Sequence, residues 1–244
     1  MRRGTILSAA AALALLWAAS ACDSRPAAPR SDVHGYTSLH YLVRDGDAAT
    51  IKQLLLDGAA PNPRDTDGVT PLHRAARDDQ LAVANVLLQY GGDPTLKTDK
   101  GWDALHLAAW QGNGAMARLL LQHGAIANRT TPQGWTVLHL AAMKGHDDVA
   151  GHAFLKWSTS AAHGAPDVNA RDARGETPLS LALGRAQFNM ALFLLAEGAD
   201  PNLAGADGRP PLLVAAEAGY EEVAMALLTH GADPRTANAQ GQRA

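Results

Sequence analysis

Apolar residues recur along most of this chain with the spacing of short amphipathic helices. One kind of segment reads Leu-x-x-Ala-Ala, which places a leucine and two small residues on one helical face. A second kind carries runs of two or three leucines, at 54–56, 87–88, 119–121, 194–195 and 227–228. The two kinds alternate along the chain. The pattern predicts alternating first and second helices, each with one face buried against its neighbours.

A regular glycine spacing organises these helices into units. The glycines that mark the spacing are Gly35, Gly68, Gly101, Gly134, Gly175, Gly208 and Gly241. The step is 33 residues throughout, except between the fourth and fifth glycines, where it is 41. A fixed period of this size indicates a stack of supersecondary units, each of which buries its apolar face against the next.

The residues around these glycines resemble the ankyrin repeat. The second unit reads Thr-Pro-Leu-His at 70–73, and the first, fourth and fifth keep most of that motif at 37–40, 136–139 and 177–180. The third and sixth depart, with Asp-Ala-Leu-His at 103–106 and Pro-Pro-Leu-Leu at 210–213. The resemblance covers residues 32–241 and implies six full repeats with the start of a seventh. It also implies that the motif histidines bond to backbone groups near the turns.

The expected fold is an all-α ankyrin-repeat solenoid, in which helix-turn-helix repeats are joined by β-hairpin-like turns. Threonine before proline is expected to cap each first helix, and proline is tolerated in a first helical turn. Glycines at 58, 91, 124, 164, 198 and 231 are expected to end the second helices in a left-handed conformation. Acid pairs at 78–79, 147–148 and 221–222 are expected at the starts of second helices, where negative charge complements the helix dipole.

The fourth repeat carries an insertion. Nineteen residues separate Gly145 from Gly164, whereas twelve separate Gly112 from Gly124 in the third repeat. Seven extra residues are very nearly two helical turns, so the second helix could lengthen without rotating its buried face. The segment 153–160 is expected to project from the second-helix side or to fold into a loop. It is either a tolerated insertion or a second contact site.

The first 21 residues have the layout of a secretory signal peptide. Arg2 and Arg3 precede an apolar run from Ile6 to Ala19, and small residues follow at 19–21. The run falls short of the roughly 20 residues that a membrane-spanning helix needs, which disfavours the alternative of a permanent transmembrane anchor. We therefore expect export from the cytoplasm and a location on the periplasmic side of a bacterial membrane.

Cys22 is the only cysteine and follows this segment directly. A lone cysteine in an exported protein has no internal disulfide partner. Residues 19–22 resemble a bacterial lipobox, although Ala19 stands where leucine is usual, and the resemblance implies that Cys22 is lipidated. The alternative is ordinary cleavage beside a free thiol. Residues 22–31, with two prolines and no apolar period, are expected to be the lipidated N-terminus and a flexible tether.

Composition and motifs argue against nucleic-acid binding and against most enzyme classes. The net charge is −3 and no Lys/Arg tract is present, so nucleic acid is not an expected partner. The chain has no Walker loop, dinucleotide-binding turn or nucleophile elbow. The repeat accounts for eight of the ten histidines, and motif copies lie too far apart to share a zinc ion. We therefore expect no catalytic residues, cofactor or metal.

In ankyrin repeats, the exposed variable positions flank the turn glycine and follow the Ala-Ala pair. Transferred to this chain, they include three of the five tryptophans, which fall in the third and fourth repeats. Aromatic residues ringed by mixed charge are typical of interface hot spots. The candidate partner-binding residues are Trp102, Trp110, Trp135, Met143, Lys144, Lys100, Tyr36 and Arg77. The alternative for Trp102 and Trp135 is packing against the next turn, whereas the position of Trp110 normally faces outward.

The resulting hypothesis is a monomeric, non-enzymatic interaction scaffold in the bacterial cell envelope. Its concave face binds an unidentified protein partner, and a lipid at Cys22 attaches it to a membrane. Two other hypotheses remain at this point. One is a small hydrolase or metal-dependent enzyme with residues spread over the first helices, and the other is a purely structural envelope protein.

Overall fold

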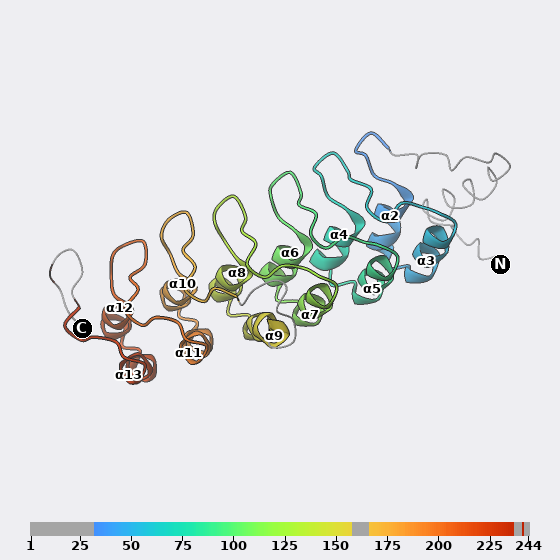
Figure 1. Cartoon of the computed structure of the whole chain (residues 1–244). Coiled ribbons are helices and arrows are strands. Elements are labelled where there is room, and N and C mark those ends of the chain that lie inside the picture. Colours follow the sequence, from blue (N-terminus) through green and yellow to red (C-terminus); the bar gives the residue numbers. More distant parts are fainter. Residues whose placement is uncertain (1–31, 158–165, 237–240, 242–244) are drawn as a thin grey trace, which may run out of the picture. The chain divides into compact units, whose positions relative to one another are not determined.

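The computed structural model describes residues 32–157, 166–236 and 241, and Figure 1 shows their arrangement. The expected signal peptide, the tether with Cys22 and the insertion glycine Gly164 lie outside these residues. The described residues form helices joined by turns and contain no strand. They fall into two compact units, divided after Ala104. Each unit is built from the expected pairs of short helices.

The first unit contains two helix pairs. Helix α2 (Ser38–Asp45) precedes α3 (Ala48–Leu56), and α4 (Pro71–Arg77) precedes α5 (Leu81–Gln89). The first helices α2 and α4 pack side by side, and so do the second helices α3 and α5. Two helix layers result, and the loop before each first helix projects from the first-helix layer (Figure 1).

The second unit repeats this arrangement four times. Its first helices are α6 (Ala104–Gln111), α8 (Val137–Lys144), α10 (Pro178–Gly184) and α12 (Pro211–Ala218). Its second helices are α7 (Gly114–Gln122), α9 (Asp147–Trp157), α11 (Phe188–Ala196) and α13 (Glu221–Thr229). Helix α10 packs between α8 and α12, and α11 packs between α9 and α13.

The first helices begin where the sequence places a capping threonine. The Thr70 hydroxyl accepts a hydrogen bond from the backbone N–H of His73, and Thr136 and Thr177 make the equivalent bond in their repeats. Pro71 stands in the first turn of α4, where an N–H would have no helical partner. In the sixth repeat Pro210 replaces the threonine, and α12 begins without a side-chain cap.

The glycines expected to end the second helices adopt left-handed backbone angles wherever they are described. Gly58, Gly91, Gly124, Gly198 and Gly231 have φ between 89° and 96°. One prediction about helix starts was wrong. Asp78 is the C-cap of α4 and Asp79 lies in the following turn with φ 53°, so this acid pair does not begin a second helix. The pairs at 147–148 and 221–222 do occupy first turns.

Small residues allow the first helices to approach one another closely. Ala75 and Ala76 in α4 are completely buried, as are Ala141 and Ala142 in α8. Leucines of the second helices fill the space between neighbouring pairs, and Leu194 is fully buried. Burial of apolar surface between neighbours is the main stabilising term in such a stack.

The insertion and the C-terminal end differ from the regular units. Helix α9 has 11 residues, against nine in α7, and Phe154 packs edge-on against Phe193 of α11. Ala153 is buried. This part of the insertion therefore belongs to the helix layer and does not project, whereas residues 158–165 are outside the described residues. At the C-terminal end, Leu228 of α13 is 43% exposed, whereas Leu195, its equivalent one repeat earlier, is 1% exposed.

Candidate protein-interaction surface

The loop that precedes each first helix is here called a finger, and in the first five fingers the side chain of the first residue accepts a backbone hydrogen bond. The six fingers are residues 32–37, 65–70, 98–103, 131–136, 172–177 and 205–210. In the second finger, the Asp65 carboxylate accepts hydrogen bonds from the N–H groups of Asp67 and Val69, at 3.0 and 2.8 Å. Asp172 makes the equivalent bonds in the fifth finger. Each of these two fingers is thus a rigid projection on which exposed side chains take fixed positions.

The motif histidines join the first helices of the first four repeats to the following turn or finger. Nδ1 of His73 accepts a hydrogen bond from the backbone N–H of Thr70 at 3.1 Å. The ring proton is therefore on Nε2, which donates to the carbonyl of Leu96 at 3.0 Å. His40, His106 and His139 bond to later carbonyls in the same way, as the resemblance implied. Burial lowers the pKa of His40, His73 and His139, which favours the neutral ring that this geometry requires.

These imidazole links end after the fourth repeat. Ser180 replaces histidine in the fifth repeat, and its hydroxyl donates to the Glu176 carboxylate at 2.6 Å. Leu213 stands at the same position in the sixth repeat. Gly205 begins the sixth finger and has no side chain to accept hydrogen bonds as Asp172 does in the fifth, so the only backbone N–H that a side chain holds there is that of Arg209, which donates to Asp207 at 2.9 Å. The polar framework of the fingers therefore weakens toward the C-terminal end.

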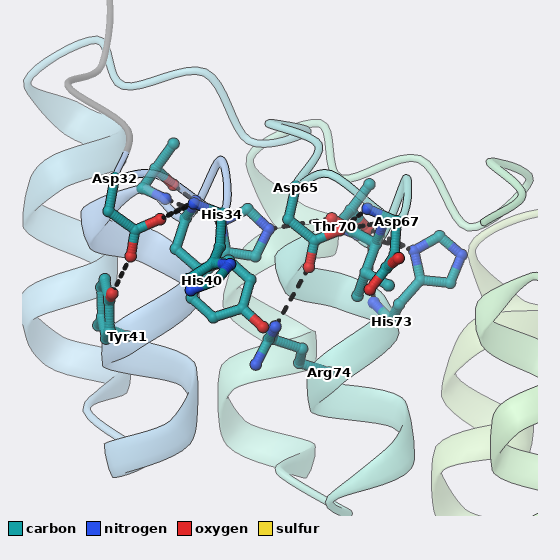
Figure 2. A network of polar contacts seen from close by, with 12 residues as sticks. Asp32, His34, His40, Tyr41, Asp65, Asp67, Thr70, His73 and Arg74 are labelled. Carbon is teal, nitrogen blue, oxygen red and sulfur yellow. Dashed lines mark hydrogen bonds and ion pairs between the residues drawn. The ribbon is translucent and has the colours of Figure 1, made fainter. Parts of the chain in front are cut away.

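Tyr36, a predicted binding residue, is engaged within the first unit. Its ring stacks on that of His40 with centroids 5.6 Å apart, and the Arg74 guanidinium carbon lies 4.1 Å from the ring centroid. Figure 2 shows Arg74 reaching Asp65 as well, at 3.2 Å. One arginine therefore joins the first finger to the second. Tyr36 is half-buried, and its ring contributes to this internal contact.

The other predicted residues of the first unit have different surroundings. Arg77 is exposed at the end of α4 and forms two hydrogen bonds to Asp78, at 2.7 and 2.9 Å. The Arg77 guanidinium holds the pKa of the Asp78 carboxyl below its usual value. Lys100 is exposed at the tip of the third finger, and Trp102, two residues later, is half-buried. The Trp102 backbone N–H donates to the Thr98 hydroxyl at 3.2 Å.

Two of the predicted residues in the second unit contact each other directly. The Lys144 ammonium nitrogen lies 4.2 Å from the ring centroid of Trp110. Trp110 is half-buried near the end of α6, and Lys144 is the exposed last residue of α8. A cation over an indole face contributes about 0.5–1 kcal/mol at an exposed site. The pair therefore forms a preorganised aromatic and cationic feature on the first-helix layer.

Met143 is only 8% exposed, so the predicted surface position is wrong for this side chain. It lies beside Lys144 on α8, which packs against both α9 and α10. The flexible, unbranched methionine side chain fits into the space between these helices, and its burial removes apolar surface from water. In this conformation Met143 packs beneath the surface residues and has little exposed area for contact with a partner.

Trp135 packs toward the next finger, as its alternative interpretation expected. Its indole N–H donates to the Asp172 carboxylate at 3.1 Å, and its backbone N–H donates to the Thr131 hydroxyl. Asp172 is 8% exposed and also accepts from its own finger. Trp135 is half-buried. It joins the fourth and fifth fingers and leaves part of its ring accessible.

Sequence reasoning missed two side-chain pairings of the second unit. The Trp135–Asp172 bond spans 37 residues, and the 41-residue step hides the register that brings the two together. Alignment of the fingers on their glycines would have placed Asp172 at the start of the finger that follows Trp135. The Lys144–Trp110 contact depends on side-chain conformation, for which the repeat pattern carries no signal.

The described residues carry little that suggests chemistry. Residues 32–157, 166–236 and 241 contain no group of three or more His, Cys, Asp or Glu side chains arranged to hold a metal ion. Within the same residues, no helix is both long and apolar enough to cross a membrane. Burial, and then the neighbouring Asp148, raise the pKa of Asp147. Cys22, the predicted lipidation site, lies outside the described residues.

Comparison with known proteins agrees with the repeat geometry. The family model for ankyrin repeats (three copies) matches residues 8–98, 90–152 and 151–238. A search of curated protein sequences gives no match to this chain. The family matches run through all six helix pairs and their fingers. The threonine caps, bridging histidines and left-handed glycines described above therefore have a common origin, and the chain belongs to the ankyrin-repeat family.

Proposed function

We propose that this protein is a non-enzymatic scaffold that binds a protein partner through its fingers and first helices. Ankyrin repeats generally mediate protein–protein interactions, and proteins built from them are generally non-enzymatic. We further propose that it works in the bacterial cell envelope, exported by the segment 1–21 and anchored by a lipid at Cys22. The scaffold acts as a monomer.

The observation that carries the proposal is the Trp110–Lys144 pair. A side chain that only packs within the repeat would be fully buried. Trp110, which follows the Ala-Ala pair in α6, is instead half-buried and leaves part of its indole exposed. The Lys144 ammonium lies 4.2 Å from the centre of that ring. A large aromatic with a fixed orientation loses little conformational entropy on binding, which is why such residues dominate interface energies.

A photo-crosslinking experiment tests where the partner binds. A photoreactive amino acid replaces Gln111, beside Trp110 on the first-helix layer, and in a matched control it replaces Arg118 on the second helix α7. Both positions are exposed in the second unit. We expect one discrete adduct in intact cells from position 111 and none from position 118. Adducts only from position 118, or no discrete adduct from either, would contradict the proposal, and the second result would favour a purely structural envelope protein.

A separate experiment tests the anchor. Cys22→Ala removes the only thiol of the chain, and we expect the protein to move from the membrane fraction to the soluble periplasmic fraction. A control variant, Ser24→Ala, changes a neighbouring residue of the tether and should leave the protein with the membrane. If the Cys22→Ala protein remains membrane-bound, attachment does not depend on this cysteine.

A further inference from the structure

The arginines of the two units differ in how their charge is compensated, whereas the exposed Lys52 and Lys100 of the first unit form no ion pair with any described carboxylate. In the first unit, four arginines each form an ion pair with an aspartate: Arg44 with Asp45, Arg64 with Asp99, Arg74 with Asp65, and Arg77 with Asp78. In the second unit, Arg209 pairs with Asp207 and Glu217. Arg118 on α7 and Arg235 after α13 form no ion pair with any described carboxylate, and neither do four cations on the side of the first helices and fingers, Lys144, Arg171, Arg174 and Arg185. All four are exposed.

These four cations belong to one side of the second unit. Lys144 is the last residue of α8, and Arg185 is the C-cap of α10, which packs against α8. Arg174 lies in the fifth finger, directly before α10, and Arg171 precedes that finger. The Arg171 guanidinium donates to the carbonyls of Gly175 and Ala204, which holds it beside the fifth and sixth fingers. We call Trp110 and these four residues the cationic surface.

The acidic groups of the fifth finger do not neutralise this surface. Asp172 is 8% exposed and accepts hydrogen bonds from two backbone N–H groups and from the Trp135 indole. Glu176 is half-buried and accepts from the Ser180 hydroxyl at 2.6 Å. The charge that this finger and its helix present to solvent is therefore positive, although the whole chain has a net charge of −3.

The exposed charged side chains described in the second-helix layer of the same unit are mostly acidic, although Arg118 of α7 is also exposed there. The exposed acids of this layer are Asp148, Glu197, Glu221 and Glu222. Three of them lie in the first turns of α9 and α13, where a carboxylate is stabilised by the helix dipole. Three of these four acids thus have a structural reason for their place. On the other side, Lys144 and Arg185 lie at helix C-terminal ends, where a cation is favoured, and Arg171 donates to backbone carbonyls, but no described carboxylate neutralises any of the four cations.

We propose that the cationic surface receives an acidic segment of a protein partner, an inference that rests on the interaction function proposed above. Arginine and lysine side chains form charge-assisted hydrogen bonds with carboxylates, and the planar arginine fork holds a carboxylate with two bonds. Trp110 adds apolar area beside the Lys144 ammonium. A segment that places an apolar side chain against Trp110 and carboxylates toward Arg174 and Arg185 would match both features.

The placement of these residues favours a narrow polypeptide over a flat membrane surface. Lys144 and Arg185 lie at the ends of first helices, and the fingers project beyond those helices (Figure 1). A flat anionic bilayer would meet the fingers first, whereas an acidic segment can lie along them and reach the helix ends. Electrostatic complementarity of this kind mainly raises the association rate and the specificity.

A selection from random peptides tests the inference while the partner is still unidentified. The full chain is immobilised, and phage that display random peptides are selected for binding to it. We expect the recovered peptides to be enriched in Asp and Glu and to contain an apolar residue. Their dissociation constants should rise with NaCl concentration, because salt screens exposed charges.

Charge-removing variants then locate the binding. The double variant Arg174→Gln/Arg185→Gln should weaken a selected acidic peptide about tenfold, since each exposed ion pair contributes a small free energy. Trp110→Ala should weaken the same peptide by a similar factor. Arg118→Gln removes an exposed arginine from the second-helix layer, so it should leave the dissociation constant unchanged within about twofold, as expected of a distant surface charge.

Each alternative result separates this inference from the proposed function. Neutral or basic peptides whose binding depends on Trp110 would overturn the acidic partner and leave the interaction function intact. If no selected peptide depends on any residue of the cationic surface, the result would count against both the acidic partner and the proposed function. Sedimentation with phosphatidylglycerol vesicles that is lost in Arg174→Gln/Arg185→Gln, without binding of acidic peptides, would assign the surface to a membrane. A concentration-dependent dimer dispersed by the same variant would instead assign it to the acidic layer of a second copy.

Discussion

Arg74 covers the ring of Tyr36 and joins two neighbouring repeats of the first unit. Its guanidinium carbon lies 4.1 Å from the ring centroid, and the same group reaches the Asp65 carboxylate at 3.2 Å. The Asp65 side chain is 1% exposed and that of Arg74 is 15% exposed. The contact is thus nearly shielded from water. It accounts for Tyr36 as a structural residue of the first finger.

Removal of Arg74 should destabilise the protein strongly. The Arg74→Ala variant leaves the buried Asp65 carboxylate without its cation, and we expect the free energy of unfolding to fall by about 3 kcal/mol. Urea unfolding followed by circular dichroism measures this change. Arg44→Ala, at an exposed pair, should cost no more than about 1 kcal/mol. Equal effects of the two substitutions would show that the Arg74 contact has no special role.

The bridging imidazole of His73 should be a second point of sensitivity. His73→Ala leaves the Leu96 carbonyl and the Thr70 N–H without their partner in a buried site, so we expect a loss of about 2 kcal/mol or more in urea unfolding. His123 is exposed at the C-cap of α7, and His123→Ala serves as the control. A similar loss in both variants would rule out the bridge as the cause.

Stability should fall in mildly acidic solution. Burial holds the pKa of His40, His73 and His139 below the usual 6.5, so the unfolded chain takes up protons first as pH decreases. The contribution of these neutral rings is complete above about pH 6.5 and is lost as pH falls below it. We expect a lower urea midpoint at pH 5.5 than at pH 7.5, and a smaller difference in His73→Asn. A midpoint that does not change over this range would contradict the neutral-ring geometry.

The sixth finger should be less protected from hydrogen exchange than the fifth. Asp172 accepts hydrogen bonds from two N–H groups of the fifth finger, whereas in the sixth Gly205 has no side chain and Asp207 accepts from one backbone N–H, that of Arg209. Ser180 also lacks the reach of the histidine that it replaces. Hydrogen exchange followed by mass spectrometry should show faster exchange in residues 203–210 than in residues 170–177. Equal protection of the two segments would mean that these side-chain contacts do not control opening.

The sequence pattern was sufficient for the fold because the repeat makes each prediction several times. Thr70, Pro71 and the closing Gly91 mark the same helix boundaries as their equivalents elsewhere, and the structure confirms those boundaries. The prediction that Asp78 and Asp79 begin a second helix was wrong because an acid pair alone does not fix its position within the repeat. The position of Asp78, one turn earlier than 147–148, makes it a C-cap, and Arg77 holds it there.

The candidate surface was harder to predict from the sequence than the fold, because it depends on which side chains contact each other. A family pattern identifies position 143 as variable, yet an apolar side chain at that position folds inward and becomes buried. The same pattern identifies Trp110 and Lys144 separately and cannot predict that the ammonium lies over the ring. Charge compensation likewise follows from distances. Arg185 was recognisable as a variable position, but its lack of a carboxylate partner was not.

The central claim is tested most directly with the partner that crosslinks at position 111. The quantity to measure is the affinity of this chain for that partner. Isothermal titration calorimetry would compare the unaltered chain with Trp110→Ala and with Phe188→Ala, a control at a 41% exposed aromatic of the second-helix layer. We predict that Trp110→Ala weakens binding by about 2 kcal/mol or more, as a hot-spot residue does, while its helix content and the affinity of Phe188→Ala remain unchanged. Undiminished affinity in Trp110→Ala, or an equal loss in Phe188→Ala, would contradict binding through the fingers and first helices.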